Sequence, residues 1–135
     1  MTKIYSFSGP PIHGSPAIKE SEYCHALVHR KEGEILGELG MVGFKNCKFW
    51  FGKTGFHPLY EKVKIEAIEK QSKHKVVQEF QESLSKQTWH PDVFTDLCNL
   101  ALDSKDQELI DYCDQISAKE WSILMQFINA KVNPL

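Results

Sequence analysis

The sequence predicts an α+β fold, in which a small antiparallel β-meander from the N-terminal half packs against three to four α-helices from the C-terminal half. All eight glycines lie in the first 55 of the 135 residues. Glycine collects in turns, bulges and strand bends, and it weakens the interior of a helix. The spacing of apolar residues also changes, from alternation in the first half to a helical period after residue 72. We therefore expect one domain, in which residues 1–57 are mainly β and loops and residues 58–135 are mainly helical.

The predicted sheet consists of short apolar segments separated by loops. Residues 3–7 alternate polar and apolar side chains, and residues 22–30 are rich in aromatic and aliphatic residues, so both segments favour strands. The glycine-punctuated segment 34–44 and the strongly apolar segment 47–51 supply two more. The last three of these segments predict a meander of about three antiparallel strands.

The second half begins with an ambiguous segment and then becomes helical. Charged and apolar residues alternate over residues 62–67, which favours an edge strand but also suits the start of a helix. From residue 72 the apolar residues recur at helical spacing and predict an amphipathic helix that ends at about residue 86.

The remaining helices are predicted from their start signals. Pro91 suits the first turn of a helix, and Ser104 and Ser117 each begin a sequence that matches a capping box. These signals predict helices that begin near these three residues. The aromatic side chains expected to pack in the core of the helical half are Trp89, Phe94, Trp121 and Phe127.

The composition is that of an ordinary globular protein, with 41% apolar and 25% charged residues. The longest unbroken apolar runs are three residues, whereas a membrane-spanning helix needs about 20 and a secretory leader about 7–15. The four cysteines are scattered and form no C-x-x-C pair, so we expect reduced and mostly buried thiols. These observations predict a cytoplasmic protein with no membrane span.

Charge is unevenly distributed along the chain, although the net charge is only −2. Residues 1–44 carry a net charge of −1, residues 45–75 carry +5 and residues 76–135 carry −6. Such asymmetry indicates either a basic binding face or two segments that pack together and neutralise each other.

The sequence favours a noncatalytic protein-interaction or adaptor domain, because no group of reactive residues stands out. Two candidate contact surfaces carry opposite charges. The acidic one, on the predicted helices, consists of Asp92, Asp96, Asp103, Asp106, Asp111 and Asp114. The basic and aromatic one consists of Lys45, Lys48, Lys53 and Trp50. We expect a protein partner, and we predict no cofactor and no metal.

A small cysteine-dependent hydrolase or acyltransferase is the alternative function. A cysteine nucleophile needs a histidine within hydrogen-bond reach to form the thiolate, and Cys47 with His25 or His29 would supply this pair. The layout Tyr23-x-His25 with Asn46-Cys47 resembles circularly permuted papain-like hydrolases and acyltransferases, in which a strand histidine precedes an asparagine–cysteine pair. That resemblance implies a catalytic role for Cys47 and His25.

Two further functions, the binding of single-stranded nucleic acid and the binding of nucleotides, have weaker support in the sequence. Basic residues around the aromatic run 49–51 are typical of single-strand nucleic-acid binders, but the chain is acidic, with a pI near 6.3, so we do not expect nucleic acid. A nucleotide-binding P-loop at Gly52-Lys53-Thr54 would require a glycine at position 47, where the chain has cysteine.

Two spaced histidines are candidate metal ligands. His25 and His29 are four residues apart and would share one face, with Cys24, Cys47 or His57 to complete the site. Zinc requires three or four convergent nitrogen or sulfur ligands, and only one pair is spaced locally. The sequence therefore gives no metal site.

Overall fold

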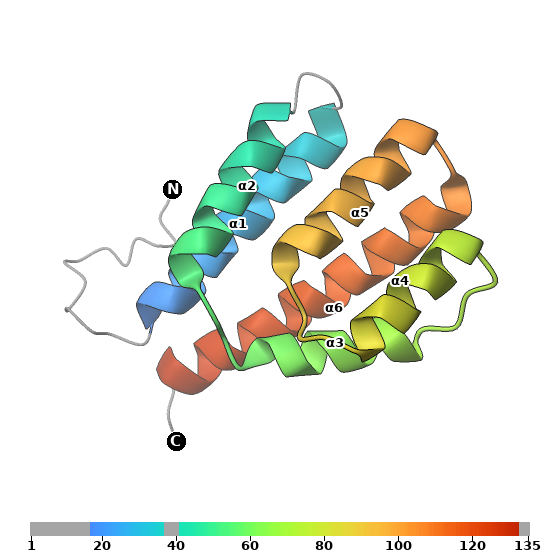
Figure 1. Ribbon diagram of the computed structural model, residues 1–135. Coiled ribbons are helices and arrows are strands. Elements are labelled where there is room, and N and C mark those ends of the chain that lie inside the picture. The colour runs from blue at the N-terminus through green and yellow to red at the C-terminus, as the bar shows by residue number, and fades with distance from the viewer. Residues whose placement is uncertain (1–16, 37–40, 133–135) are drawn as a thin grey trace.

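The computed structural model describes residues 17–36 and 41–132, and within these ranges it contains six helices and no strand (Figure 1). The helices are α1 (Ala17–Leu36), α2 (Met41–Thr54), α3 (Leu59–Glu69), α4 (Lys75–Ser85), α5 (Pro91–Ser104) and α6 (Gln107–Val132). The predicted α+β fold is wrong, because the described part of residues 1–57 is helical rather than β.

The individual strand predictions fail in the same way. The predicted strands at 22–30 and 47–51 lie inside α1 and α2, and the ambiguous segment 62–67 lies inside α3. The predicted strand at 34–44 falls on the end of α1 and the start of α2, with residues 37–40 between them outside the described part. The strand predicted at 3–7 also lies outside the described residues.

The glycines misled the prediction because two of them serve helix packing rather than turns. Gly33 in α1 and Gly43 in α2 are both buried where the two helices meet. A Cβ atom added to Gly43 would lie 2.8 Å from the backbone nitrogen of Gly33 and 2.8 Å from the carbonyl oxygen of His29. The absence of a side chain therefore lets the two backbones approach closely. Among the glycines of residues 17–36 and 41–132, only Gly55, with φ of +66°, fills the turn role, since it follows the end of α2.

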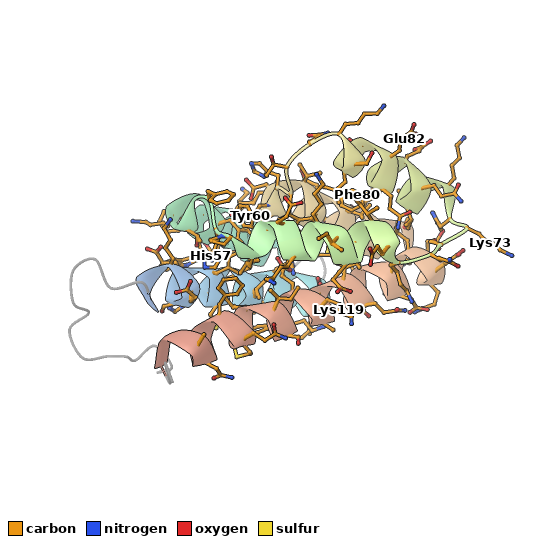
Figure 2. All side chains as sticks on the ribbon, turned by 90° about the horizontal axis from the view of Figure 1, so that it is seen from below. His57, Tyr60, Lys73, Phe80, Glu82 and Lys119 are labelled. Atoms are coloured by element: carbon orange, nitrogen blue, oxygen red, sulfur yellow. The ribbon has the colours of Figure 1, made fainter. Side chains whose placement is uncertain are left out.

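Four of the other five described helices contact the long C-terminal helix α6. α1 and α2 lie side by side as an antiparallel hairpin, α5 runs beside this hairpin, and α6 contacts α1, α3, α4 and α5 (Figure 1). From below, α3 lies along α6, with His57 and Tyr60 near the start of α3 and Lys119 on α6 (Figure 2). The Tyr112 hydroxyl of α6 donates a hydrogen bond to the carbonyl oxygen of Ala67 in α3, at 2.6 Å.

The helix predictions for the second half are partly confirmed. α4 and α5 match the predicted helices, and Pro91 occupies the first turn of α5. However, α6 is one continuous helix, so the start predicted at Ser117 is wrong. α5 continues through Ser104, and Asp106 begins α6 instead, because its Oδ1 accepts hydrogen bonds from the backbone N–H groups of Glu108 and Leu109.

The core combines side chains from every helix. Trp89 and Phe94 are buried, as predicted, and their rings lie 5.2 Å apart between centroids. Phe80 of α4 packs its ring edge-on against Trp89 and against Tyr112 of α6. Trp121 and Phe127, which were also predicted to be in the core, are only partly buried and pack against its edge.

Candidate functional site

A buried ionic network joins α1 to α6 in the centre of the molecule. The Arg30 guanidinium is 2% exposed and donates a hydrogen bond to the Glu120 carboxylate, which is 0% exposed. The Tyr23 hydroxyl donates to the other carboxylate oxygen, and Arg30 also donates to the Ser117 hydroxyl at 3.3 Å. The guanidinium carbon lies 4.9 Å from the centroid of the Phe94 ring, which adds a cation–π contact.

The close packing of these groups changes the pKa values of two of them. Burial and the neighbouring Glu120 carboxylate raise the pKa of the Tyr23 hydroxyl well above its usual value. The nearby Glu120 carboxylate also raises the pKa of Arg30, against the opposing effect of burial. Arg30 therefore stays charged, and its pairing with Glu120 compensates the cost of removing both charges from water.

A second buried pair joins α1 to the start of α3. The His57 imidazole and the Glu20 carboxylate are both buried and hydrogen-bonded to each other. The backbone N–H of Leu59 donates to His57 Nδ1 at 3.0 Å. Because Nδ1 accepts this bond, the ring hydrogen lies on Nε2, which donates it to Glu20. This histidine thus fixes the start of α3 against α1.

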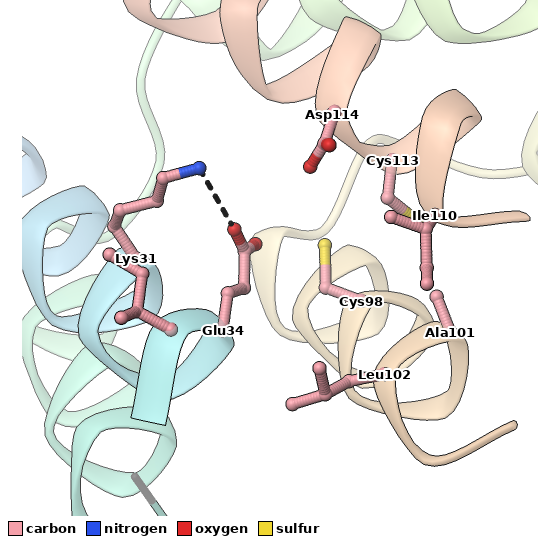
Figure 3. Close-up of a pocket in the computed structure, with 9 residues that line it drawn as sticks. Lys31, Glu34, Cys98, Ala101, Leu102, Ile110, Cys113 and Asp114 are labelled. Carbon is pink, nitrogen blue, oxygen red and sulfur yellow. Dashed lines mark ion pairs between the residues drawn. The ribbon is translucent and has the colours of Figure 1, made fainter. Parts of the chain in front are cut away.

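A cavity of about 190 Å³ opens between α1, α5 and α6 beside this network. Figure 3 shows the Lys31–Glu34 ion pair of α1 on one side and Asp114 of α6 opposite. The remaining walls are largely apolar and come from Ile35, Ala101, Leu102 and Ile110, together with the thiols of Cys98 and Cys113. An adjoining cavity of about 210 Å³ shares the three charged residues and is also lined by Leu27, Arg30, Ser117 and Trp121.

The candidate nucleophile Cys47 lies in the core of the helical array. It is 0% exposed, and its thiol is hydrogen-bonded to the Thr95 hydroxyl at 3.6 Å rather than to a histidine. Burial raises the pKa of the Cys47 thiol to about 12. The strand layout on which the papain-like resemblance depends is absent from the described residues, because His25 and Cys47 both lie in helices.

The two spaced histidines lie on the side of α1 that faces α2. The His25 ring stacks on the Trp50 indole, with 4.7 Å between centroids, and His29 is hydrogen-bonded to Glu32 at 2.9 Å. Burial, with the adjacent His29, lowers the pKa of His25. Across residues 17–36 and 41–132, no group of three or more His, Cys, Asp or Glu side chains is placed to hold a metal ion.

The predicted acidic face is divided among several sides of the molecule. Asp96 pairs with Lys48 of α2 at 2.6 Å, and Asp106 bonds to His74 at the start of α4 at 2.8 Å. Asp111 accepts a hydrogen bond from Gln107, and Asp114 lines the cavity that faces α1. Asp92 and Asp103 lie at the two ends of α5. These six aspartates therefore do not form one docking surface.

Two of the four residues predicted for the basic and aromatic surface, Lys45 and Lys53, share one exposed side of α2, whereas Trp50 stacks on His25. Val42, Lys45, Phe49 and Lys53 follow helical spacing and are all exposed, and we name them the α2 stripe. The exposed fractions of Val42 and Phe49 are 64% and 57%, and Lys53 Nζ lies 5.4 Å from the centroid of the Phe49 ring. Lys48 lies outside the stripe because it turns toward Asp96, whose hydrogen bond raises the pKa of Lys48.

The sequence predictions missed most of the polar groups in the centre of the molecule. Glu120 was interpreted as part of a capping box and Arg30 as part of a strand, yet the two form the central ion pair. The sequence does contain a signal for this buried face. Glu20, Tyr23, Leu27 and Arg30 recur at intervals of three and four residues, so they share one face of a helix. Because two members of that face are charged, an apolar pattern alone did not reveal it.

Comparisons with protein-family models, with curated proteins and with solved structures found no match to this chain. Of the helices that the structure describes, none is both long and apolar enough to cross a membrane.

Proposed function

We propose that this protein is a noncatalytic interaction domain that binds a protein partner through the α2 stripe. The observation that carries the proposal is the pair of large apolar side chains, Val42 and Phe49, exposed two turns apart on one face of α2. Grouped exposed apolar side chains are typical of a contact surface, whereas single ones are ordinary.

The chemistry of the stripe indicates the kind of partner surface. Lys45 and Lys53 flank Phe49 by one turn on each side, so the apolar contact is bordered by positive charge. The partly exposed Trp50 adjoins Phe49, with 5.5 Å between ring centroids. Aromatic residues are enriched where interfaces bind most tightly. We therefore infer a partner segment that presents apolar side chains next to Asp or Glu.

The catalytic alternative gains no support from the environment of Cys47. A nucleophilic thiol needs a lowered pKa and access to substrate, whereas this thiol is buried and its pKa is raised. We do not carry the hydrolase or acyltransferase function further.

Affinity capture with matched variants tests the proposal. Extract from the native host is passed over immobilised wild type, Phe49→Ser and Leu100→Ser, and retained proteins are identified by mass spectrometry. Leu100 is the control because it is an equally apolar, 47% exposed residue on α5. We expect one partner on the wild type and on Leu100→Ser, and about tenfold weaker binding of the purified partner to Phe49→Ser.

Two results would contradict the proposal. One is capture that Phe49→Ser reduces no more than Leu100→Ser does. The other is capture abolished by nuclease treatment, since the contact would then run through nucleic acid.

A further inference from the structure

We propose that the cavity between α1, α5 and α6 binds a single ammonium group carried on an apolar stem. This site lies apart from the α2 stripe and does not depend on the function proposed for that surface. Three properties of the cavity support it: its size, the nature of its walls and its charge balance.

The size and the walls fit a compact apolar stem. The cavity is partly open to solvent and has a volume of about 190 Å³, and an apolar cavity of about 150 Å³ is large enough to hold benzene. Ile35 of α1, Leu102 of α5 and Ile110 of α6 supply apolar surface from three directions. A ring or short alkyl chain placed among them would remove apolar surface from water on both sides of the contact.

The charged rim lacks one positive charge. Lys31 is paired with Glu34 at 3.6 Å, and Glu34 also lies 3.9 Å from the guanidinium of Arg30, which is paired with the buried Glu120. Asp114 faces the Lys31–Glu34 pair across the cavity (Figure 3). Asp114 is exposed, and within the described part of the chain it has no hydrogen bond or ion pair of its own. Of the side chains that line this cavity, one cation, Lys31, therefore faces two carboxylates, Glu34 and Asp114, which leaves one net negative charge.

An ammonium group meets this requirement better than the other ligand classes. It would donate charge-assisted hydrogen bonds to Asp114 and Glu34, which are among the strongest that proteins form. An anion would add to the negative charge of the rim. A neutral ligand would displace water from Asp114 and leave its charge without a partner.

A titration followed by NMR tests whether the cavity prefers an ammonium group to a neutral or an anionic group. The amide spectrum of the ¹⁵N-labelled full chain is recorded with phenethylamine, with the neutral 2-phenylethanol and with the anionic phenylacetate. We expect saturable shifts for the amine in residues of α1, α5 and α6, at least about tenfold weaker binding of the alcohol, and no saturation by the anion.

A matched pair of variants locates the site. Asp114→Asn removes the unpaired carboxylate, and we expect about tenfold weaker binding of phenethylamine. Asp111→Asn is the control, because Asp111 lies on the same helix and bonds to Gln107 instead of lining the cavity. We expect this control to bind as the wild type does.

A further arm distinguishes the source of the ammonium group. Tighter binding of phenethylamine than of Nα-acetyl-lysine methylamide would indicate a free organic amine, and the opposite order would indicate a lysine side chain of another protein. The proposal is overturned by unsaturated shifts for both amines at about 10 mM, by equal binding of the alcohol, or by equal losses in the two variants. Capture through the α2 stripe is measured separately and does not decide this result.

Discussion

Three histidine side chains bind backbone N–H groups at the starts of helices, and two of them, His74 and His90, are the N-cap residues of α4 and α5. His57, His74 and His90 each accept, at Nδ1, a hydrogen bond from the backbone N–H two residues later. In the first two, Nε2 is then free to donate to a carboxylate of another helix: Glu20 of α1 or Asp106 at the start of α6. Each of these two imidazoles thus binds the backbone at the start of one helix and also connects that helix to a second one. The sequence shows these histidines but not their partners, which are more than 30 residues away.

Also at the residue scale, the reactivity of each cysteine thiol should follow how deeply it is buried. Since burial raises the pKa of Cys47 to about 12, we expect about one molecule in ten thousand to carry this thiolate at about pH 8. Under alkylation in native buffer, the partly exposed Cys24 should react first. Cys47, Cys98 and Cys113 should react only after unfolding in urea.

Intact-mass measurement over time, followed by peptide mapping, identifies which thiol has reacted. Native Cys47 that is labelled as fast as a free model thiol would contradict the buried position and would restore the case for cysteine chemistry.

At the scale of the element, the α1–α2 hairpin shows that one local sequence pattern can arise from two different structures. The glycines of a β-meander and those of a close helix crossing look the same in a sequence, since both positions exclude a side chain. The apolar pattern adds to the ambiguity in α3, where Val63 and Ala67 are buried four residues apart while Ile65 between them is 46% exposed. The three residues alternate along the chain, yet their burial follows the helical period.

Two alanine substitutions in α2 test the crossing. Gly43→Ala places a Cβ atom 2.8 Å from backbone atoms of Gly33 and His29, so we expect it to lower the free energy of unfolding by about 1–3 kcal/mol. Gly52→Ala is the control, because no atom lies within 4 Å of its added Cβ. There the better helix propensity of alanine should raise the free energy of unfolding by about 0.5–1 kcal/mol.

Urea unfolding followed by circular dichroism measures both variants. Changes of the same sign in Gly43→Ala and Gly52→Ala would show that the two helices do not depend on close backbone contact.

At the scale of the whole molecule, buried polar contacts join segments that are distant in the sequence. Arg30 and Glu120 connect α1 to α6 across 90 residues, and His57 and Glu20 connect α3 to α1 across 37. A buried ion pair adds less stability than well-packed apolar side chains of the same volume, but the loss of one partner leaves the other charge unpaired. We infer that the Arg30–Glu120 pair fixes how α1 sits on α6.

Removal of one buried charge should therefore be costly. We expect Glu120→Gln to lower the free energy of unfolding by about 3–5 kcal/mol, because Arg30 would stay charged and buried and would keep only its longer ion pair with Glu34, at 3.9 Å. Glu66→Gln is the control, since Glu66 pairs with Lys119 at 3.8 Å near the surface. Its expected effect is within about 1 kcal/mol.

A compensating variant separates charge from packing. If the buried charge of Arg30 causes the loss once Glu120 is neutral, then Arg30→Met combined with Glu120→Leu should recover much of the stability that Glu120→Gln loses, as urea unfolding would show. No recovery, together with equal effects of the two glutamate variants, would contradict the role of the pair.

The sequence by itself determined the elements whose apolar spacing is regular and whose ends carry local signals. α4 follows from its amphipathic period, and α5 follows from Pro91 and the apolar stripe behind it. The burial of most cysteine thiols also followed from their scattered positions. These features depend on residues within a few turns of each other, so the local pattern contains the information.

Only the tertiary structure decided the class of the first half, the continuity of α6 and the membership of the central network. The buried face of α1 includes Glu20 and Arg30, and these charges are stable there only because His57 and Glu120 are brought to them from other helices. The close contact of Gly33 and Gly43 likewise exists only once two helices pack together. The physical reason is that the environment of a buried charge, or of a residue without a side chain, is set by neighbours in space, and a single sequence lists neighbours along the chain alone.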